Sequence, residues 1–291
     1  MSKIVLLGAN GQLGNDIKKV FKESDTKLIP LTREDLDAEK DDVNKKLERF
    51  RGTDYLINTI AYNKVDDAED FIGKAFKTNS FFVYKLSKFC TSNDVTLIHI
   101  STDYVFDGKK NEPYKETDLP NPLNVYGNSK LAGEFFVRNY CEKYFIFRIS
   151  SLFGIAGSRG KGGNFVETMI KLAKENKPLK IISNQYMSPT HTLDVARTIK
   201  TFIDKDINEY GIYHACNTGL CSWHEFAKTI FEFTNIKANL SEITYEDYKT
   251  KAKRPKYSVM DNTRVSKYYK MPEWEEALKE YLVEKGLMVE E

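Results

Sequence analysis

The sequence is poor in cysteine, in long apolar runs and in net charge. Its four cysteines are scattered and form no Cys-x-x-Cys pair, so we expect reduced thiols rather than a disulfide framework. No stretch approaches about 20 consecutive apolar residues, which excludes a helix that spans a membrane. The 44 basic and 42 acidic side chains give a formal net charge of +2, so we expect neither nucleic acid nor a membrane as a partner.

Histidine is also scarce, and none of the four histidines is spaced as a metal ligand. We interpret each as a satisfied structural histidine and predict no metal site; they are His99, His191, His214 and His224. A bound Mg²⁺ stays possible through carboxylates near the C-terminus, although a solvated helix face explains them equally well; they are Glu273, Glu275, Glu276 and Glu280. The first residues show no signal-peptide pattern, so we expect a cytoplasmic protein.

A glycine-rich loop follows the first apolar run. Residues 3–7 predict a buried strand, and apolar residues at helical spacing follow the loop GANGQLG, residues 8–14. Gly8 would permit a tight turn, Gly11 would let the backbone approach a pyrophosphate, and Gly14 would let helix and strand pack closely. This context predicts a dinucleotide site. For the loop alone an ordinary glycine turn stays open, because the spacing is G-x-x-G-x-x-G rather than G-x-G-x-x-G.

The end of the second predicted strand, residues 28–32, bears on the choice of cofactor. Arg33 suits a 2′-phosphate through its forked guanidinium, whereas Glu34 could accept the ribose hydroxyls of NAD(H). Arg33 could also be a solvated loop cation. We therefore predict NADP(H) as the preferred cofactor, with NAD(H) possible.

A hydroxyl-rich strand end and a later helix carry the candidate catalytic residues. Residues 95–100 predict a buried strand that leads into Ser-Thr-Asp, and the helix expected over residues 125–140 begins after a plausible Asn N-cap. On that helix Tyr126 and Lys130 lie one turn apart and share one face with Glu134. A Tyr-x-x-x-Lys pair alone is common by chance.

The chemistry of carbonyl reduction explains this residue set. The reaction needs a hydride from a nicotinamide and a proton for the developing alkoxide. Tyr126 could supply the proton, and an ammonium at Lys130 would favour the phenolate while binding the nicotinamide ribose. Thr102 would polarise the substrate oxygen. Together with the glycine loop, these residues predict a hydride-transferring enzyme.

Strands and helices alternate through the first half of the chain, which predicts an α/β fold with a Rossmann-like, doubly wound parallel sheet. The expected strands are 3–7, 28–32, 54–60, 95–100 and 144–150, and the expected helices are 12–22, 68–90 and 125–140, with a short charged helix within 35–51. After Phe153 the alternation loosens, so we predict a dinucleotide-binding domain over 1–153 and a smaller C-terminal substrate-binding lobe over 154–291. Residues 193–216 would return to the first domain, and the glycines of 157–163 suit a mobile lid.

These motifs carry a family resemblance that covers nearly the whole chain. The chain resembles the extended short-chain dehydrogenase/reductases and, within them, the dTDP-4-dehydrorhamnose reductases. STDYVFDG and P-x-N-x-Y-G-x-x-K-x-x-G-E are specific to that subfamily rather than to the fold. The matching segments are 8–14, 57–69, Asn79, 101–108, 122–134, 162–169, 184–196 and Arg254-Pro255.

The resemblance implies roles for individual residues. The catalytic residues would be Thr102, Tyr126 and Lys130. The cofactor would be bound by Gly8, Asn10, Gly11, Gln12, Leu13, Gly14, Arg33, Asp37, Ile60, Ala61, Tyr62, Asn79, Tyr126 and Lys130, with Asp37 near the adenine. The substrate, a nucleotide sugar, would contact Thr102, Asp103, Ser151, Asn164, Gln185 and Arg254. A homodimer is common in the wider family and is possible here.

One departure leaves the substrate open. Members of the best-known rhamnose group carry a tryptophan after the R-T-S of the sixth strand, and Ser151 holds that place here. The chain could therefore reduce another 4-keto nucleotide sugar. An epimerase or dehydratase is a further alternative, although Asp103-Tyr104 after Thr102 breaks the Asp-Glu pattern of a dehydratase. A regulatory subunit of the same fold also stays open, because such a protein could keep all three catalytic side chains.

Overall fold

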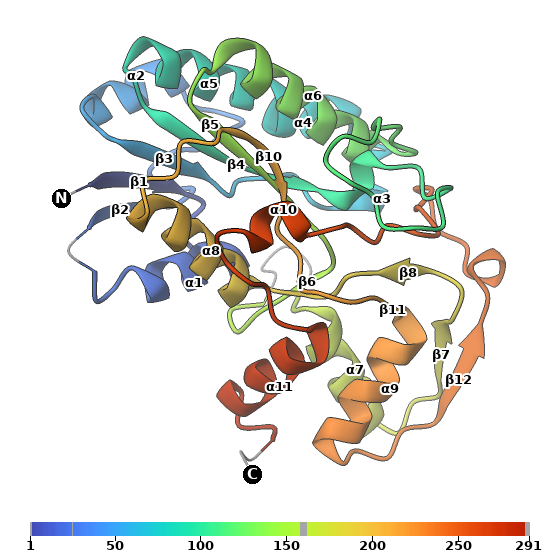
Figure 1. Cartoon of the computed structure of the whole chain (residues 1–291). Helices are drawn as coiled ribbons and strands as arrows, with labels where there is room; N and C mark the ends of the chain where they lie inside the picture. The colour runs from blue at the N-terminus through green and yellow to red at the C-terminus, as the bar shows by residue number, and fades with distance from the viewer. Residues whose placement is uncertain (1, 25, 158–161, 289–291) are drawn as a thin grey trace.

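A six-stranded, wholly parallel sheet forms the centre of the molecule (Figure 1). The computed structural model describes residues 2–24, 26–157 and 162–288. The strand order is β10-β5-β4-β3-β1-β2, so the direction of winding reverses between β1 and β3. In sheets of this kind, ligands bind at the carboxyl ends of the strands beside this reversal. The strands are β1 (Lys3–Leu7), β2 (Lys27–Leu31), β3 (Tyr55–Asn58), β4 (Thr96–Thr102), β5 (Tyr144–Ile149) and β10 (Gly211–His214).

Helices cover both faces of this sheet because its strands are apolar on both sides. Successive side chains of a strand point to opposite faces. Ile4 and Leu6 accordingly share a buried cluster with one helix layer, and Val5 and Leu7 share a cluster with the other. The predicted Rossmann-like, doubly wound fold is confirmed. The first layer contains α1 (Gln12–Val20) and α8 (Thr192–Asp204), and the second contains α2 (Val43–Leu47), α5 (Phe82–Ser92) and α6 (Val125–Tyr140).

The helix expected over 68–90 is present over residues 72–92, but it starts later than predicted and contains a π-helical turn. The wider winding of that turn is not revealed by an apolar periodicity. The elements of this region are α3 (Val65–Ala68), α4 (Ile72–Phe76), the π-helical turn Lys77–Phe81 and α5. The charged helix expected within 35–51 is present as α2 and a 3₁₀ turn, Glu48–Phe50.

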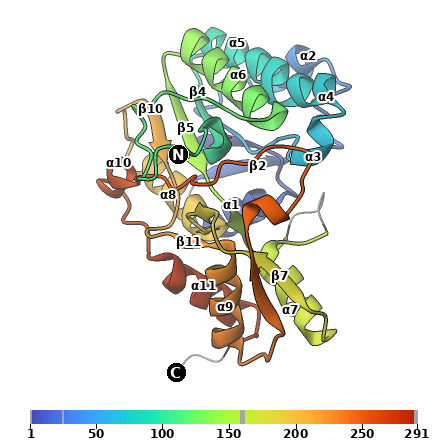
Figure 2. The same cartoon turned by 90° about the vertical axis from the view of Figure 1, so that its right-hand side faces the viewer.

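Within the described residues, the C-terminal part of the chain adds two-stranded sheets and three helices of ten or more residues. These helices lie below the main sheet in Figure 2. Their apolar faces enclose a separate buried cluster that includes Phe153, Phe226 and Trp274. Two of the helices begin with capping boxes, formed by Asn164 with Glu167 and by Ser222 with Glu225. The elements are β6 (Leu152–Phe153), α7 (Phe165–Lys174), β7 (Leu179–Ile182), β8 (Tyr186–Met187), β9 (Thr190–His191), β11 (Cys221–Ser222), α9 (Trp223–Thr234), β12 (Leu240–Ile243), α10 (Thr263–Ser266) and α11 (Trp274–Glu284).

The chain passes between these parts more than once. After α7 and β7 it returns to the main sheet, where α8 packs on one face and β10 pairs with β5. The predicted division at residue 153 stays a prediction. Of the predicted lid, residues 158–161 lie outside the described residues. Among the residues that are described, every helix is too short or too polar to cross a lipid bilayer.

Candidate active site

The turn after β1 depends on its glycines. Gly8 has a φ of +79°, and a Cβ there would lie 2.6 Å from Thr59 Oγ1. A Cβ at Gly14 would lie only 2.3 Å from the carbonyl oxygen of Gly8, and the Gly11 amide donates to that same oxygen at 2.8 Å. A side chain at Gly8 or Gly14 would therefore force the turn away from the helix that follows it.

This turn leaves the beginning of α1 free to bind an anion. Helix α1 starts at Gln12, and among the described residues no side chain caps it at Gly11. The first amides of a helix have no partner within the helix, and its dipole favours negative charge at that end. These features fit the pyrophosphate of a dinucleotide beside Asn10, Gln12 and Leu13.

The structure brings Arg33 and Asp37, two of the predicted cofactor residues, together just after β2. Arg33 Nε donates to Asp37 Oδ2 at 3.0 Å, and a second guanidinium nitrogen lies 3.4 Å from Glu39 Oε1. The hydrogen bond to Asp37 raises the pKa of Arg33, and its side chain is 69% exposed. A charged, accessible guanidinium therefore stands at the carboxyl edge of the sheet.

The segment after β3 is tied to α6 through Asn79. The Tyr62 amide donates to Asn79 Oδ1 at 2.8 Å, while Asn79 Nδ2 donates to the Tyr62 carbonyl and to Ser129 Oγ. Asn79 is fully buried in the π-helical turn. It holds the backbone of Tyr62, which is predicted to lie along the nucleotide, and its own side-chain amide is engaged within the protein.

Thr102 and Tyr126 meet where β4 ends and α6 begins. Thr102 Oγ1 donates to Asp103 Oδ1 at 3.1 Å, and a Cβ on Gly127 would lie 2.3 Å from the Tyr104 carbonyl oxygen. That close approach holds the start of α6 against the strand end. Burial raises the pKa of Tyr126 to about 12; a hydrogen bond with the Thr102 side chain opposes the rise, and the charge of Asp103 adds to it.

Lys130 is 1% exposed and lies behind Tyr126, beside the backbone of β4. Its Nζ donates to the Ile100 carbonyl at 2.5 Å and lies 3.5 Å from His99 Nε2. Burial lowers the pKa of Lys130 to about 8, against the opposing charge of Glu134. The pKa of Tyr126 is shifted by burial, by Thr102 and by Asp103, and Lys130 is not among these groups. Stabilisation of the phenolate by the Lys130 ammonium therefore stays a prediction.

A buried ion pair anchors α6 one turn beyond Lys130. Arg148 on β5 donates from Nε and a terminal nitrogen to the two carboxylate oxygens of Glu134, at 2.9 and 2.7 Å. Ser101 Oγ donates to the same carboxylate at 2.5 Å. The side chains of the pair are 1% and 0% exposed. Arg148 is not among the residues predicted from the sequence, where an arginine inside the apolar run YFIFRI was the available signal.

The predicted substrate residues near β4 and β5 show unusual environments. Burial raises the pKa of Asp103 to about 6, and Ser150 Oγ donates to its Oδ2 at 2.9 Å. Ser151 has a φ of +43°, a conformation that non-glycine residues seldom adopt. Such strain clusters at functional sites, because the surrounding structure must support it.

The other predicted substrate residues lie farther along the chain and are engaged within the protein. The Asn164 amide donates to the Gly154 carbonyl and to Tyr281 Oη, and Gln185 Nε2 donates to the Pro255 carbonyl. Arg254 forms a two-pronged ion pair with Asp66 of α3, at 2.6 and 3.1 Å. These contacts tie the C-terminal segment to the N-terminal part; the substrate roles of Asn164, Gln185 and Arg254 stay predictions.

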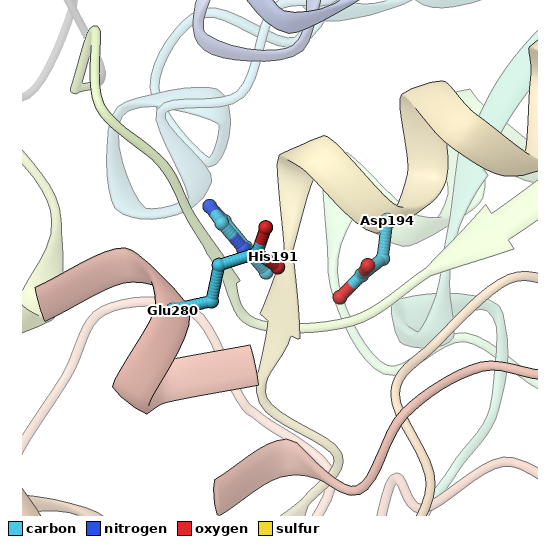
Figure 3. Close-up of side chains that lie close together, drawn as sticks. All are labelled: His191, Asp194 and Glu280. Carbon is cyan, nitrogen blue, oxygen red and sulfur yellow. The ribbon is translucent and has the colours of Figure 1, made fainter. Parts of the chain in front are cut away.

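His191 does not fit the interpretation as a satisfied structural histidine. Its ring is fully buried and stacks on Phe153, and neither ring nitrogen has a hydrogen-bond partner among the described residues. Figure 3 shows it between Asp194 and Glu280, and possible ligand atoms of the three residues lie within 4.8 Å of one another. Spacing along the chain did not reveal this group, because Glu280 comes from α11. Arg197 pairs with both carboxylates, and Asn217 Nδ2 donates to Asp194, so the two acidic side chains have partners within the protein.

The parallel sheet, the glycine turn of β1 and the Thr-Tyr-Lys set at the end of β4 together define a short-chain dehydrogenase/reductase. Residues 2–286 match the family model described as the RmlD substrate binding domain. The chain belongs to this family, within the extended short-chain dehydrogenase/reductases, and is an NAD(P)-dependent oxidoreductase.

Three similar proteins illustrate this membership. The spore coat polysaccharide biosynthesis protein SpsK of Bacillus subtilis (strain 168) is 37% identical, over 98% of this chain and 99% of its own. The crystal structure of a dTDP-4-dehydrorhamnose reductase from Clostridium acetobutylicum is 39% identical with a TM-score of 0.91, over 98% and 99% of the two chains. That of the Bacillus anthracis dTDP-4-dehydrorhamnose reductase in complex with NADP is 37% identical with a TM-score of 0.91, over 98% and 100%.

Proposed function

We propose that this protein uses NADPH to reduce the 4-keto group of a dTDP-4-dehydro-6-deoxy sugar, converting dTDP-4-dehydro-L-rhamnose to dTDP-L-rhamnose. The observation that carries the proposal is the packing of α6, which carries Tyr126 and Lys130, against the end of β4, which carries Thr102. The glycine turn of β1 lies at the same edge of the sheet. The names of the Clostridium and Bacillus anthracis relatives support the sugar, and the NADP of the latter complex supports the cofactor.

Each catalytic side chain has a defined part in this reaction. The cofactor supplies a hydride to the carbonyl carbon. As negative charge develops on the carbonyl oxygen, the Tyr126 phenol gives that oxygen its proton and becomes a phenolate. The high pKa of Tyr126 keeps the phenol protonated before the reaction. The Thr102 hydroxyl, at the end of β4, orients the same oxygen. Lys130 binds the nicotinamide ribose, and the positive charge of its ammonium stabilises the phenolate.

The exposed guanidinium of Arg33 supports the preference for NADPH. It stands at the end of β2, the position that selects the 2′ substituent in dinucleotide folds. A two-pronged contact with a 2′-phosphate would require Arg33 to exchange one of its present carboxylate partners. We expect Arg33→Ala to raise the KM for NADPH about tenfold or more while leaving that for NADH nearly unchanged.

The deciding experiment measures NADPH oxidation with freshly generated dTDP-4-dehydro-L-rhamnose. We expect turnover by the natural protein, with loss of at least about a hundredfold in Tyr126→Phe, because general acid catalysis contributes that much. Tyr84→Phe is the matched control, since Tyr84 packs against Phe136 and Tyr140 away from the sheet edge. Tight NADPH binding without turnover would overturn the proposal and favour a regulatory subunit that keeps its cofactor site.

Ser151 favours a second candidate, the reduction of another 4-keto nucleotide sugar. It replaces the planar, apolar tryptophan of the best-known rhamnose group with a small hydroxyl. Its left-handed backbone conformation shows that this segment is held in a special geometry. Supplying several 4-keto sugars in the same assay would separate the two candidates. A Ser151→Trp variant that gained activity on dTDP-4-dehydro-L-rhamnose would favour the second. The homodimer stays a prediction.

A further inference from the structure

A buried row of polar side chains lies behind the candidate active site, and the reaction described above does not use two of its members. Asn58 ends β3, His99 lies within β4, and Lys130 comes down from α6, three neighbouring elements in Figure 1. Asn58 and His99 are fully buried and Lys130 is 1% exposed. Gly133 permits this approach, since a Cβ there would lie 2.3 Å from the Asn79 carbonyl oxygen and 3.6 Å from His99 Nε2.

The hydrogen bonds of Asn58 fix the tautomer of His99. The Ile60 amide donates to Asn58 Oδ1 at 3.1 Å, which identifies the oxygen of the side-chain amide. The nitrogen of that amide therefore faces His99 Nδ1, also at 3.1 Å. An amide nitrogen only donates, so Nδ1 must accept, and the ring hydrogen must sit on Nε2. Burial keeps the ring neutral by lowering the pKa of His99 well below its usual value, and the charge of Lys130 acts in the same direction.

This tautomer points an N–H donor at Lys130. His99 Nε2 lies 3.5 Å from Lys130 Nζ, and an ammonium has three donors and no acceptor. An Nε2–H opposite an ammonium is therefore a mismatch, whereas the lone pair of a neutral amine could accept it. The Ile100 carbonyl accepts from Nζ in either state. The contact with His99 thus distinguishes the two protonation states of Lys130.

Resting on the function proposed above, we propose that Asn58 and His99 are positioning residues for Lys130. They fix an Nε2–H donor that the lone pair of a neutral amine can accept and an ammonium cannot. This contact favours the neutral state and so sets the pH at which Lys130 loses its charge.

The other charged groups around Lys130 leave room for the contact with His99 to affect its protonation state. Glu134 on its own helix favours the ammonium, but it is paired with Arg148 from β5 and accepts from Ser101 on β4. The charge of Asp103, after β4, adds to the rise in the pKa of Tyr126. The lowering of the pKa of Lys130 to about 8, chiefly by burial, agrees in direction with an environment that favours the neutral amine.

Two measurements test the proposal without relying on turnover. The first is ¹⁵N NMR of the natural protein labelled at histidine, with the His99 signals assigned by their loss in His99→Gln. A neutral ring with its hydrogen on Nε2 is expected, and a hydrogen on Nδ1 would overturn the proposal.

The second measurement follows the Cε signal of Lys130 against pH, assigned by its loss in Lys130→Met. Asn58→Asp is nearly isosteric, and its carboxylate would accept from Nδ1–H and turn Nε2 into an acceptor for the ammonium. The pKa of Lys130 should then rise by about one pH unit or more. His214→Asn is the matched control: His214 is likewise buried, and its partner is the Asp261 carbonyl rather than Lys130.

An unchanged Lys130 titration in Asn58→Asp would contradict the proposal even if the enzyme is active. If the substrate is turned over, the alkaline limb of the kcat profile should move with the NMR titration. If no turnover is found but both NMR results hold, the proposed function fails while the assignment of Asn58 and His99 to Lys130 stands. Should Asn58→Asp not fold, the tautomer of the natural protein decides.

Discussion

Two arginine–carboxylate clusters in this molecule use the same chemistry in opposite surroundings. Arg148 and Glu134 form a two-pronged pair behind the active site, with side chains 1% and 0% exposed. Arg197 forms a two-pronged pair with Glu280 near the junction of α8 and α11, with side chains 37% and 39% exposed. The first pair receives a further hydrogen bond from Ser101, whereas the second lies beside a histidine whose ring nitrogens have no partner among the described residues.

The difference shows what burial does to an ion pair. In water-exposed surroundings solvent replaces a lost partner, so the pair contributes little to stability. In a buried site the remaining charge has nothing to replace its partner, so the two side chains become mutually indispensable. We therefore expect the Arg148–Glu134 pair to be essential for holding α6, and with it Lys130, in place. The Arg197–Glu280 pair should contribute much less to stability.

The largest effect is expected from removing one half of the buried pair. Glu134→Gln leaves Arg148 charged, buried and short of an acceptor, so the free energy of unfolding should fall by about 3–5 kcal/mol. Urea unfolding measures it. The double variant Glu134→Leu/Arg148→Met should regain most of the loss, and a double variant as unstable as the single one would show that packing rather than charge is responsible.

A buried carboxyl without a cationic partner should give the next largest effect, as a pH dependence. The pKa of Asp103 is raised to about 6 from an ordinary value of 3.8, so the folded state binds more protons between these values. Stability due to this group is present below about pH 4 and is lost as the pH rises through 6, amounting to about 3 kcal/mol. Asp103→Asn should remove this decline from a series of unfolding curves, and an unchanged decline would assign it to other groups.

A smaller effect, of opposite sign, is expected at His191. Its two buried ring nitrogens lack partners among the described residues, so His191→Leu removes a desolvation cost while keeping contact with Phe153. The free energy of unfolding should rise by about 1 kcal/mol. A thermal melt measures it, with Phe153→Leu as a packing control. A clear loss of stability in His191→Leu would mean that the ring does have partners in solution.

The smallest effect should come from the exposed pair. Glu280→Gln should cost about 0.5–1 kcal/mol, because solvent reaches both side chains of the pair with Arg197. Most of that cost should disappear in 1 M salt, which screens exposed charges but hardly affects buried ones. A loss as large as that of Glu134→Gln would erase the contrast between the two clusters.

Much of the fold could be predicted because local signals and tertiary structure agree. The apolar runs of β1, β4 and β5, and the Asn124 cap whose Oδ1 accepts from the Gly127 amide, are all visible in sequence. The π-helical turn at Lys77–Phe81 was not predictable; it places Asn79 between Tyr62 and Ser129, two residues far from it in the chain. Contacts of this kind, between segments far apart in the chain, leave no trace in the local periodicity of the sequence.

The candidate site was predictable in its residues but not in their buried partners. The Tyr126–Lys130 spacing follows from helix geometry, and the structure accordingly places both at the end of β4. The contact of Lys130 with His99 depends on which nitrogen the Asn58 amide faces. The approach of Glu280 to His191 joins residues from α11 and β9. Both are consequences of packing between segments far apart in the chain, where spacing carries no information.

The late pairing of β10 with β5 also has a consequence for biosynthesis. Strand β5 is the aromatic and β-branched run YFIFRI, and its outer edge is covered only when residues 211–214 pair with it. While the ribosome makes the intervening segment, this edge has its amides and carbonyls open to other nascent chains. Low-charge runs of this kind are the segments that join into intermolecular sheets. A chain that stalls before β10 is made therefore exposes a strand edge that can pair with other chains. Pairing of β10 with β5 covers that edge and so protects the protein from aggregation.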